Sequence, residues 1–167
     1  MSQSLLPDDL VAMAARVIAE NRAAGRTVAL AESCTGGLVA AALTEVAGSS
    51  AVLDRGFVTY SNDAKREVLG VPADLLDTFG AVSVATAWAM AQGALRHSHA
   101  DVAVAISGIA GPDGGSASRP VGTVVFARAI RDGDHEDVDA EERLLDASSR
   151  AAVRHQAALI ALELLLP

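Results

Sequence analysis

Hydrophobic residues are arranged in two ways along the chain, and the two arrangements separate helices from strands. Apolar residues at helical spacing predict long helices over residues 10–18, 83–97 and 148–166. Shorter apolar runs, typical of buried strands, lie at residues 27–32, 53–59, 101–107 and 122–130. Turn and cap signals add two shorter helices, one that ends near residue 46 and one that carries Lys65.

An Asp-Gly pair marks a hairpin after the last long apolar strand. Residues 131–134 favour a tight turn, so residues 135–145 are expected to return as a more exposed strand. The predicted order of elements is α-β-α-β-α-α-β-β-β-α. This order indicates a three-layer α/β/α fold with a mixed, mostly parallel sheet. Because the sequence has no internal repeat, linker or low-complexity block, residues 1–167 are expected to form a single domain.

Composition narrows the class of protein. The chain has 13 Lys and Arg against 21 Asp and Glu, a net charge of −8, and 3% aromatic residues. Nucleic-acid binding relies on a basic face and on aromatic stacking, so no nucleic-acid partner is expected. Membrane contact is not expected either, because no apolar run reaches the ~20 residues of a membrane span. The N-terminus does not resemble a signal peptide, and the single cysteine fits a reducing compartment, so we expect a cytoplasmic protein.

The first candidate for chemistry is segment 31–37, Ala-Glu-Ser-Cys-Thr-Gly-Gly, between a predicted strand and a predicted helix. Free backbone N–H groups at the start of a helix attract anions. They can also stabilise the oxyanion that forms when a serine attacks a carbonyl group, which makes Ser33 a candidate nucleophile. The alternative is that Ser33 and Thr35 merely cap the helix while Gly36 and Gly37 form a turn.

The second candidate is Lys65, the only lysine of the chain, since the other twelve of the 13 basic side chains are arginine. A desolvated lysine can lose its proton and act as a base, whereas arginine cannot. Tyr60, the only tyrosine, lies just before it. The alternative is a solvated helix lysine paired with Asp63 or Glu67.

The third candidate is segment 107–115, Ser-Gly-Ile-Ala-Gly-Pro-Asp-Gly-Gly, which directly follows an apolar strand. Ligands of open α/β sheets lie at the carboxyl ends of strands, and a glycine-rich loop can offer N–H groups to a phosphate or an acyl oxygen. The segment fits neither the Walker loop nor the dinucleotide fingerprint. The alternative is a plain surface loop.

Other side chains give weaker signals. None of the four histidines has a Glu or Cys at a metal-ligand spacing, so no metal site is expected. Because no histidine lies in the three segments, a Ser-Lys pair is a better hypothesis than a Ser-His-Asp triad. Cys34 is an alternative nucleophile, although a small buried side chain is its more usual role. On the last predicted helix, Arg150 or Arg154 could reach an anionic substrate.

Residues 31–37, 56–65, 107–115 and 120–124, in this order, resemble the CinA C-terminal domain family. The resemblance covers about residues 10–165, and the four segments are far more specific together than singly. It implies an amidohydrolase that converts nicotinamide mononucleotide to nicotinate mononucleotide and ammonia in pyridine nucleotide salvage. It also implies a small-molecule nucleotide as the partner, no metal, no cofactor and a homo-oligomeric assembly.

Carried over residue by residue, the resemblance assigns roles within the three segments. Ser33 would be the nucleophile, Lys65 the base that takes its proton, and Tyr60 would orient this pair or the substrate. The residues implied for substrate binding are Thr35, Gly36, Gly37, Ser107, Gly108, Gly111 and Arg150. In the expected mechanism, N–H groups at the helix start stabilise the oxyanion. Protonated Lys65 gives its proton to the departing ammonia, and water then hydrolyses the ester.

The sequence departs from the family pattern in two places. Family members often have Gly-Asp-Arg before the last helix, whereas residues 147–150 read Ala-Ser-Ser-Arg. Arg150 is therefore kept as the candidate for phosphate binding, but its direction is left open. Many relatives also carry a molybdopterin-binding-like domain before this one, so we expect the stand-alone type of deamidase.

Two other functions compete with the amidohydrolase. A non-catalytic nucleotide-binding module would keep the glycine-rich loops without turnover, although the presence of both Ser33 and Lys65 speaks against it. An interaction protein of DNA uptake or repair is suggested by the family's competence-related name. The acidic composition and the few aromatic residues argue against direct DNA contact.

Overall fold

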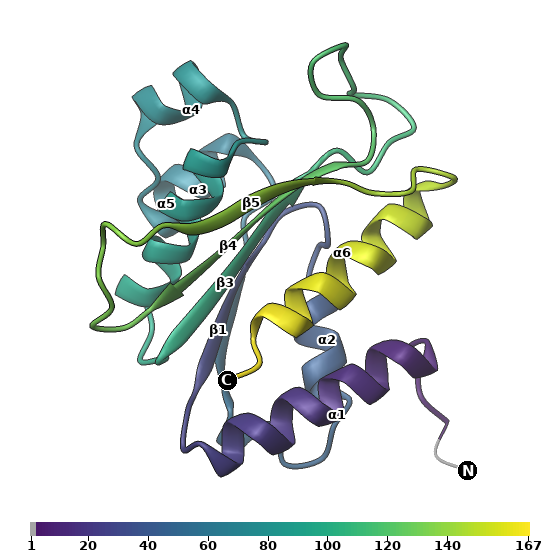
Figure 1. The fold of residues 1–167 in the computed structure, drawn as a ribbon, viewed down its shortest axis with the longest axis vertical. Coiled ribbons are helices and arrows are strands. Elements are labelled where there is room, and N and C mark those ends of the chain that lie inside the picture. Colours follow the sequence, from purple (N-terminus) through teal and green to yellow (C-terminus); the bar gives the residue numbers. More distant parts are fainter. Residues whose placement is uncertain (1–2) are drawn as a thin grey trace.

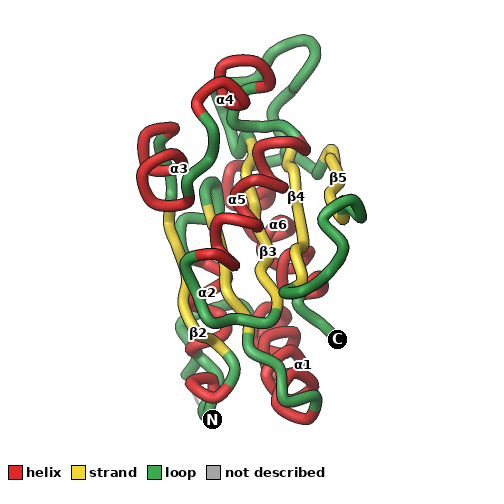
Figure 2. The backbone as a smooth tube through the Cα atoms, turned by 90° about the vertical axis from the view of Figure 1, so that its left-hand side faces the viewer, coloured by secondary structure: helices red, strands yellow, loops and turns green. Residues whose placement is uncertain are grey.

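Five strands form one mixed sheet between two layers of helices (Figures 1 and 2). The structure, a computed structural model, describes residues 3–167; residues 1 and 2 of the N-terminus, where no signal peptide is expected, lie outside this range. The strands are β1 (Val28–Glu32), β2 (Leu53–Val58), β3 (Val102–Gly108), β4 (Thr123–Ile130) and β5 (Asp139–Leu144).

The strand order is β2-β1-β3-β4-β5, so that β2 and β5 are the edges in Figure 2. Strand β1 pairs in parallel with β2 and with β3, whereas β4 is antiparallel to β3 and β5 is antiparallel to β4. Four of the five strands therefore run in the same direction. The predicted three-layer fold with a mixed, mostly parallel sheet is confirmed.

The helices divide evenly between the two faces (Figure 1). One face is covered by α1 (Asp8–Ala23), α2 (Leu38–Thr44) and α6 (Arg150–Leu164). The other face carries α3 (Asn62–Leu69), α4 (Ala73–Phe79) and α5 (Val84–Arg96). A 3-10 helix, η1 (Ser49–Ala51), precedes β2. Within residues 3–167, none of the helices has the length and apolar character needed to cross a membrane.

Side-chain size alternates along the central strands, and this alternation explains why the two layers differ. Successive residues of a strand point to opposite faces. In β1, Val28 and Leu30 pack in the core below α1, α2 and α6, whereas Ala29 and Ala31 face α5. Strand β3 repeats the pattern with valine, isoleucine and alanine. The alanine face allows α5 to lie close to the sheet.

The structure corrects several predicted boundaries. Helix α4 and η1 were not predicted, because segments of seven and three residues show too little periodicity. Strand β5 begins at Asp139 and not at residue 135, because turns and loop occupy residues 131–138. Helix α2 begins at Leu38, directly after segment 31–37 as predicted, but it ends at Thr44 and not near residue 46. Helix α3 is capped by the hydroxyl of Ser61, and not by the asparagine or aspartate that follows it.

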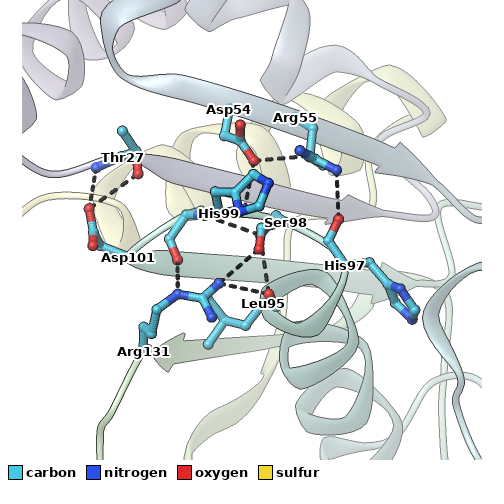
Figure 3. A network of polar contacts seen from close by, with 10 residues as sticks. Thr27, Asp54, Arg55, Leu95, His97, Ser98, His99, Asp101 and Arg131 are labelled. Atoms are coloured by element: carbon cyan, nitrogen blue, oxygen red, sulfur yellow. Dashed lines mark hydrogen bonds and ion pairs between the residues drawn. The ribbon is translucent and has the colours of Figure 1, made fainter.

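Polar side chains close the end of the sheet at which β1 and β3 begin (Figure 3). The Asp101 carboxylate accepts hydrogen bonds from the backbone N–H and the hydroxyl of Thr27, at 2.8 and 3.1 Å. The Arg131 guanidinium donates to the carbonyls of Leu95, Ser98 and Ala100. These contacts join the end of α5 to β3 and β4, and they lie at the end opposite to the three candidate segments.

Candidate active site

The three parallel strands end side by side, and each candidate segment follows one of them. Glu32, the last residue of β1, is in register with Val58 of β2 and with Ile106 of β3. Segments that are far apart in the sequence therefore meet at the carboxyl edge of the sheet, where ligands of α/β proteins bind. They line a pocket of about 270 Å³ that also receives the first turn of α6.

The structure brings Ser33 and Lys65 into direct contact. The Lys65 Nζ donates to Ser33 Oγ at 3.0 Å. It also donates to the backbone carbonyls of Thr59 and Tyr60, at 3.0 and 3.2 Å. Because residues of β1 alternate between faces, Glu32 points toward α2 while Ser33 points toward α3, which carries Lys65. Lys65 is 1% exposed, so the alternative of a solvated lysine is wrong.

Burial sets the chemistry of this lysine. Desolvation lowers the pKa of Lys65 below the ordinary value of 10.5, because the charged form loses its hydration shell. The three acceptors around the Lys65 Nζ are a hydroxyl and two carbonyls, and all three are uncharged. The charged amine can donate to all three, whereas the neutral amine keeps two N–H bonds for the Thr59 and Tyr60 carbonyls and has a lone pair left for the Ser33 hydroxyl. That lone pair is what a general base requires.

Cys34 is buried next to Ser33, but its environment favours the thiol over the thiolate. Burial raises the pKa of Cys34 to about 11, and a hydrogen bond from its own backbone N–H and the positive charge of Arg154 offset this effect only in part. The thiolate is the nucleophilic form of cysteine. At neutral pH the Cys34 side chain is therefore a poor nucleophile, and Ser33, in contact with a base, is the better one.

Glu32 occupies the start of α2. Its buried carboxylate accepts hydrogen bonds from the backbone N–H groups of Gly37, Val39 and Ala40, at 3.0, 3.2 and 2.9 Å. The N–H groups that we expected to stabilise an oxyanion are thus already used by the protein itself. Sequence analysis did not assign Glu32 a role, although an acidic residue just before a helix is a known capping signal.

Thr35, Gly36 and Gly37 are not brought to the pocket. Thr35 is fully buried, and its carbonyl accepts a hydrogen bond from Arg154. Gly36 and Gly37 adopt positive φ angles of 60° and 95°, which glycine alone adopts at low cost. These three residues shape the turn between β1 and α2, and the buried Thr35 hydroxyl has no hydrogen-bond partner among the residues described.

The third segment forms one wall of the pocket through Ser107, Gly108 and Gly111. The Ser107 hydroxyl donates to the Ala81 carbonyl at 2.8 Å, which fixes the loop before α5. A Cβ on Gly108 would lie 2.7 Å from the Val124 side chain, so the neighbouring strand β4 by itself requires glycine there. Sequence analysis did not assign a role to Asp113, which also lines this wall.

Arg150 and Tyr60 meet at the mouth of the pocket. The Arg150 guanidinium donates to the Gly111 carbonyl at 2.7 Å and to the Tyr60 hydroxyl at 3.1 Å. It therefore connects Tyr60 to segment 107–115, even though the turn before Arg150 departs from the family pattern. The Tyr60 side chain is 62% exposed, and the contact of Tyr60 with Lys65 is through its backbone carbonyl.

The fold and these contacts define a class of protein. It is a three-layer α/β protein with a buried serine–lysine pair in a pocket at the carboxyl ends of its parallel strands. The chain belongs to the CinA family, because the sequence profile of the CinA C-terminal domain matches residues 10–167.

Individual relatives support this assignment. A nicotinamide-nucleotide amidohydrolase PncC from Enterobacter agglomerans is 54% identical over 142 residues, which cover 85% of this chain and 84% of the relative. A protein of the same name from Escherichia coli K12 is 52% identical over 144 residues, or 86% and 85% of the two chains. The crystal structure of the competence/damage inducible protein CihA from Agrobacterium tumefaciens is 53% identical. It superposes with a TM-score of 0.92 over 98% of this chain and 97% of that one.

Proposed function

We propose that this protein is an amidohydrolase that converts nicotinamide mononucleotide to nicotinate mononucleotide and ammonia, in pyridine nucleotide salvage. The observation that carries the proposal is the 3.0 Å hydrogen bond from Lys65 to Ser33 inside a pocket. Relatives that are 52% and 54% identical over most of their length bear the name nicotinamide-nucleotide amidohydrolase. The pair supplies a nucleophile and a base, which amide hydrolysis needs.

In the proposed mechanism, neutral Lys65 accepts the proton of Ser33 as Oγ attacks the carboxamide carbon. The C–N bond of the tetrahedral intermediate then breaks, and protonated Lys65 transfers its proton to the nitrogen that leaves as ammonia. Water next attacks the ester on Ser33 while Lys65 accepts its proton. The bond between the acyl carbon and Ser33 Oγ then breaks, and Lys65 returns its proton to Ser33 Oγ and becomes neutral again. The carboxylic acid product loses its own proton to water and leaves as the carboxylate.

The rest of the nucleotide is assigned to the pocket mouth. Arg150 offers a guanidinium next to the pocket, and arginine matches the geometry of a phosphate. We assign the substrate phosphate to Arg150 and the pyridine ring to the space between Tyr60 and Ser107. A pocket of about 270 Å³ suits a mononucleotide better than a dinucleotide.

Location and assembly are part of the same proposal. A cytoplasmic location is supported by the single buried thiol, which takes part in no disulfide among the residues described. Homo-oligomerisation is supported by three large apolar side chains that are exposed to solvent. They are Phe79 at the end of α4, Val138 just before β5, and Leu144 at the end of β5. Light scattering of the purified protein measures the oligomeric state.

Ammonia release from nicotinamide mononucleotide is the test of the proposed activity. Wild type, Ser33→Ala, Lys65→Ala and the control Cys34→Ala are compared in the presence of EDTA. We expect turnover in wild type and Cys34→Ala and loss of turnover in the other two variants. If wild type binds the nucleotide and releases no ammonia, the protein is a nucleotide-binding module and the proposal is wrong.

A further inference from the structure

The turn that follows Ser33 is held from the side of α6 by Arg154. The Arg154 Nε donates to the Cys34 carbonyl at 3.1 Å, and its Nη2 donates to the Thr35 carbonyl at 3.0 Å. Arg154 lies one helical turn beyond Arg150 and is partly buried. Its guanidinium thus stabilises the loop between β1 and α2. This contact argues against the hypothesis that Arg154 binds an anionic substrate.

The geometry of the turn shows what the two hydrogen bonds from Arg154 determine. A hydrogen bond of 3.0 Å from the Gly36 N–H to the Ser33 carbonyl closes a turn with Cys34 and Thr35 at its centre. Arg154 thus holds the carbonyls of both central residues. The N–H and the C=O of a trans peptide group point in opposite directions. Since the Ser33 carbonyl points into the turn, the Cys34 N–H of the same peptide group points out of it.

Among the residues described, the backbone N–H of Cys34 interacts only with the side chain of Cys34 itself. Cys34 lines the pocket next to Ser33, and its N–H donates to no other residue in the described part of the chain. The N–H groups at the start of α2 are held by Glu32. A backbone N–H immediately after a nucleophile is a common donor to the oxyanion in acyl transfer.

We propose that Arg154 is a positioning residue of the amidohydrolase: it fixes the turn so that the Cys34 N–H donates to the oxyanion formed when Ser33 attacks. The inference rests on the proposed function in taking Ser33 as the nucleophile. Arginine suits this task because its planar fork binds two acceptors at once in a fixed geometry. A donor fixed in advance stabilises the transition state without reorganisation.

The test compares Arg154→Met and Arg154→Lys with Arg131→Met. Arg131 is the matched control, because its guanidinium also holds backbone carbonyls, but at the opposite end of the sheet (Figure 3). Turnover of nicotinamide mononucleotide gives kcat and KM, and thermal unfolding gives the stability of each variant. Pyridine-3-boronic acid is the second probe. The Ser33 oxygen bonds to its boron, Lys65 takes the serine proton, and the tetrahedral adduct bears a negative charge that mimics the oxyanion.

We expect Arg154→Met to lower kcat by about 10²-fold, as a small misplacement of reacting groups does, while KM stays unchanged. Affinity for the boronic acid falls in parallel, and Arg154→Lys recovers part of both losses because an ammonium group can hold one carbonyl. Arg131→Met lowers the unfolding temperature and leaves kcat and boronic acid affinity unchanged.

Two results would overturn the inference. A rise in KM at constant kcat makes Arg154 a substrate-binding residue, and a loss of stability alone makes it a structural one. The two probes also separate this inference from the proposed function. If wild type releases no ammonia but binds the boronic acid more tightly than Arg154→Met does, the substrate is wrong and the positioning role stands. If wild type does not bind the boronic acid, Ser33 is not activated and the positioning role is wrong.

Discussion

A single lysine among arginines is the clearest functional signal at the scale of residues. Placing an ammonium group in a buried site is unfavourable, and Lys65 is 1% exposed with uncharged partners. The same burial lowers the pKa of Lys65 and makes the neutral amine accessible, which is the form that the proposed base needs. Arginine cannot replace it, since a guanidinium stays protonated.

The activity and the stability of the protein are both expected to depend on the charge of Lys65. Since the proposed base is the neutral amine of Lys65, we expect kcat/KM to rise with pH and to level off above the lowered pKa of Lys65, which lies below 10.5. Between that lowered pKa and 10.5, the unfolded chain holds the proton and the folded protein does not. Stability relative to Lys65→Met therefore also rises with pH across this window. Rate profiles and denaturant titrations at several pH values measure both effects, and a rate that falls as pH rises would contradict the assignment.

Cys34 is expected to be dispensable for turnover. Because burial raises the pKa of Cys34 to about 11, the side chain is a thiol at neutral pH. Cys34→Ala should keep kcat and lose about 1 kcal/mol of stability, as a small deletion in a core does. Iodoacetamide should label the native protein slowly. A loss of turnover as large as that of Ser33→Ala would instead identify Cys34 as the nucleophile.

At the scale of elements, the contact between α3 and α5 sets the position of the base. Gly93 of α5 faces the last residue of α3, Leu69, so closely that an added Cβ would overlap the Leu69 carbonyl oxygen. Helix α3 also carries Lys65. The small residue on α5 therefore determines how near α3, and with it the Lys65 amine, can lie to the sheet.

Gly93→Ala is expected to destabilise the protein by about 2–3 kcal/mol through overpacking and to lower kcat by displacing α3. Helix propensity alone predicts the opposite sign, because alanine in a helix is favoured over glycine by about 1 kcal/mol. Denaturant unfolding and the amidase assay measure the two effects. An increase in stability would show that α3 and α5 are not in this close contact.

The elements themselves follow closely from the sequence. The long helices follow from helical periodicity and the four apolar strands from short apolar runs. The cap of α6, Ser149, lies at the start of the helix predicted over residues 148–166. The seven-residue α4 and the start of β5 were missed because short or exposed segments carry little pattern. The cap of α2 was also missed, since the carboxylate of Glu32 reaches the helix from the strand before it.

At the scale of the whole molecule, the pocket exists only because four regions of the chain converge. Ser33 follows β1, Lys65 lies in the first turn of α3, Gly111 lies in the loop after β3, and Arg150 begins α6. All four line one pocket. The Arg150 guanidinium bridges two of these regions. The phosphate site that we propose at Arg150 thus depends on the assembled fold.

Arg150→Met is expected to raise KM for nicotinamide mononucleotide by about 10- to 100-fold, because a charged hydrogen bond to phosphate is lost. Nicotinamide riboside, which has no phosphate, should be turned over with the same KM by wild type and variant. Arg66→Met is the matched control, because Arg66 pairs with Asp63 on the exposed side of α3. Equal losses with both substrates would show that Arg150 supports the structure of the pocket mouth and does not bind the phosphate.

The sequence by itself determined the fold class, the order of most elements, and the candidate pair Ser33 and Lys65, because periodicity and rare residue types are local features. Only the tertiary structure decided which side chains meet. It brings Lys65 into hydrogen-bond contact with Ser33, and it shows that Glu32 binds the N–H groups at the start of α2. It also shows that Arg154 binds the turn after Ser33 and that Thr35 does not line the pocket. These contacts join residues that are up to 120 positions apart. They depend on strand register and helix packing, which no local pattern encodes.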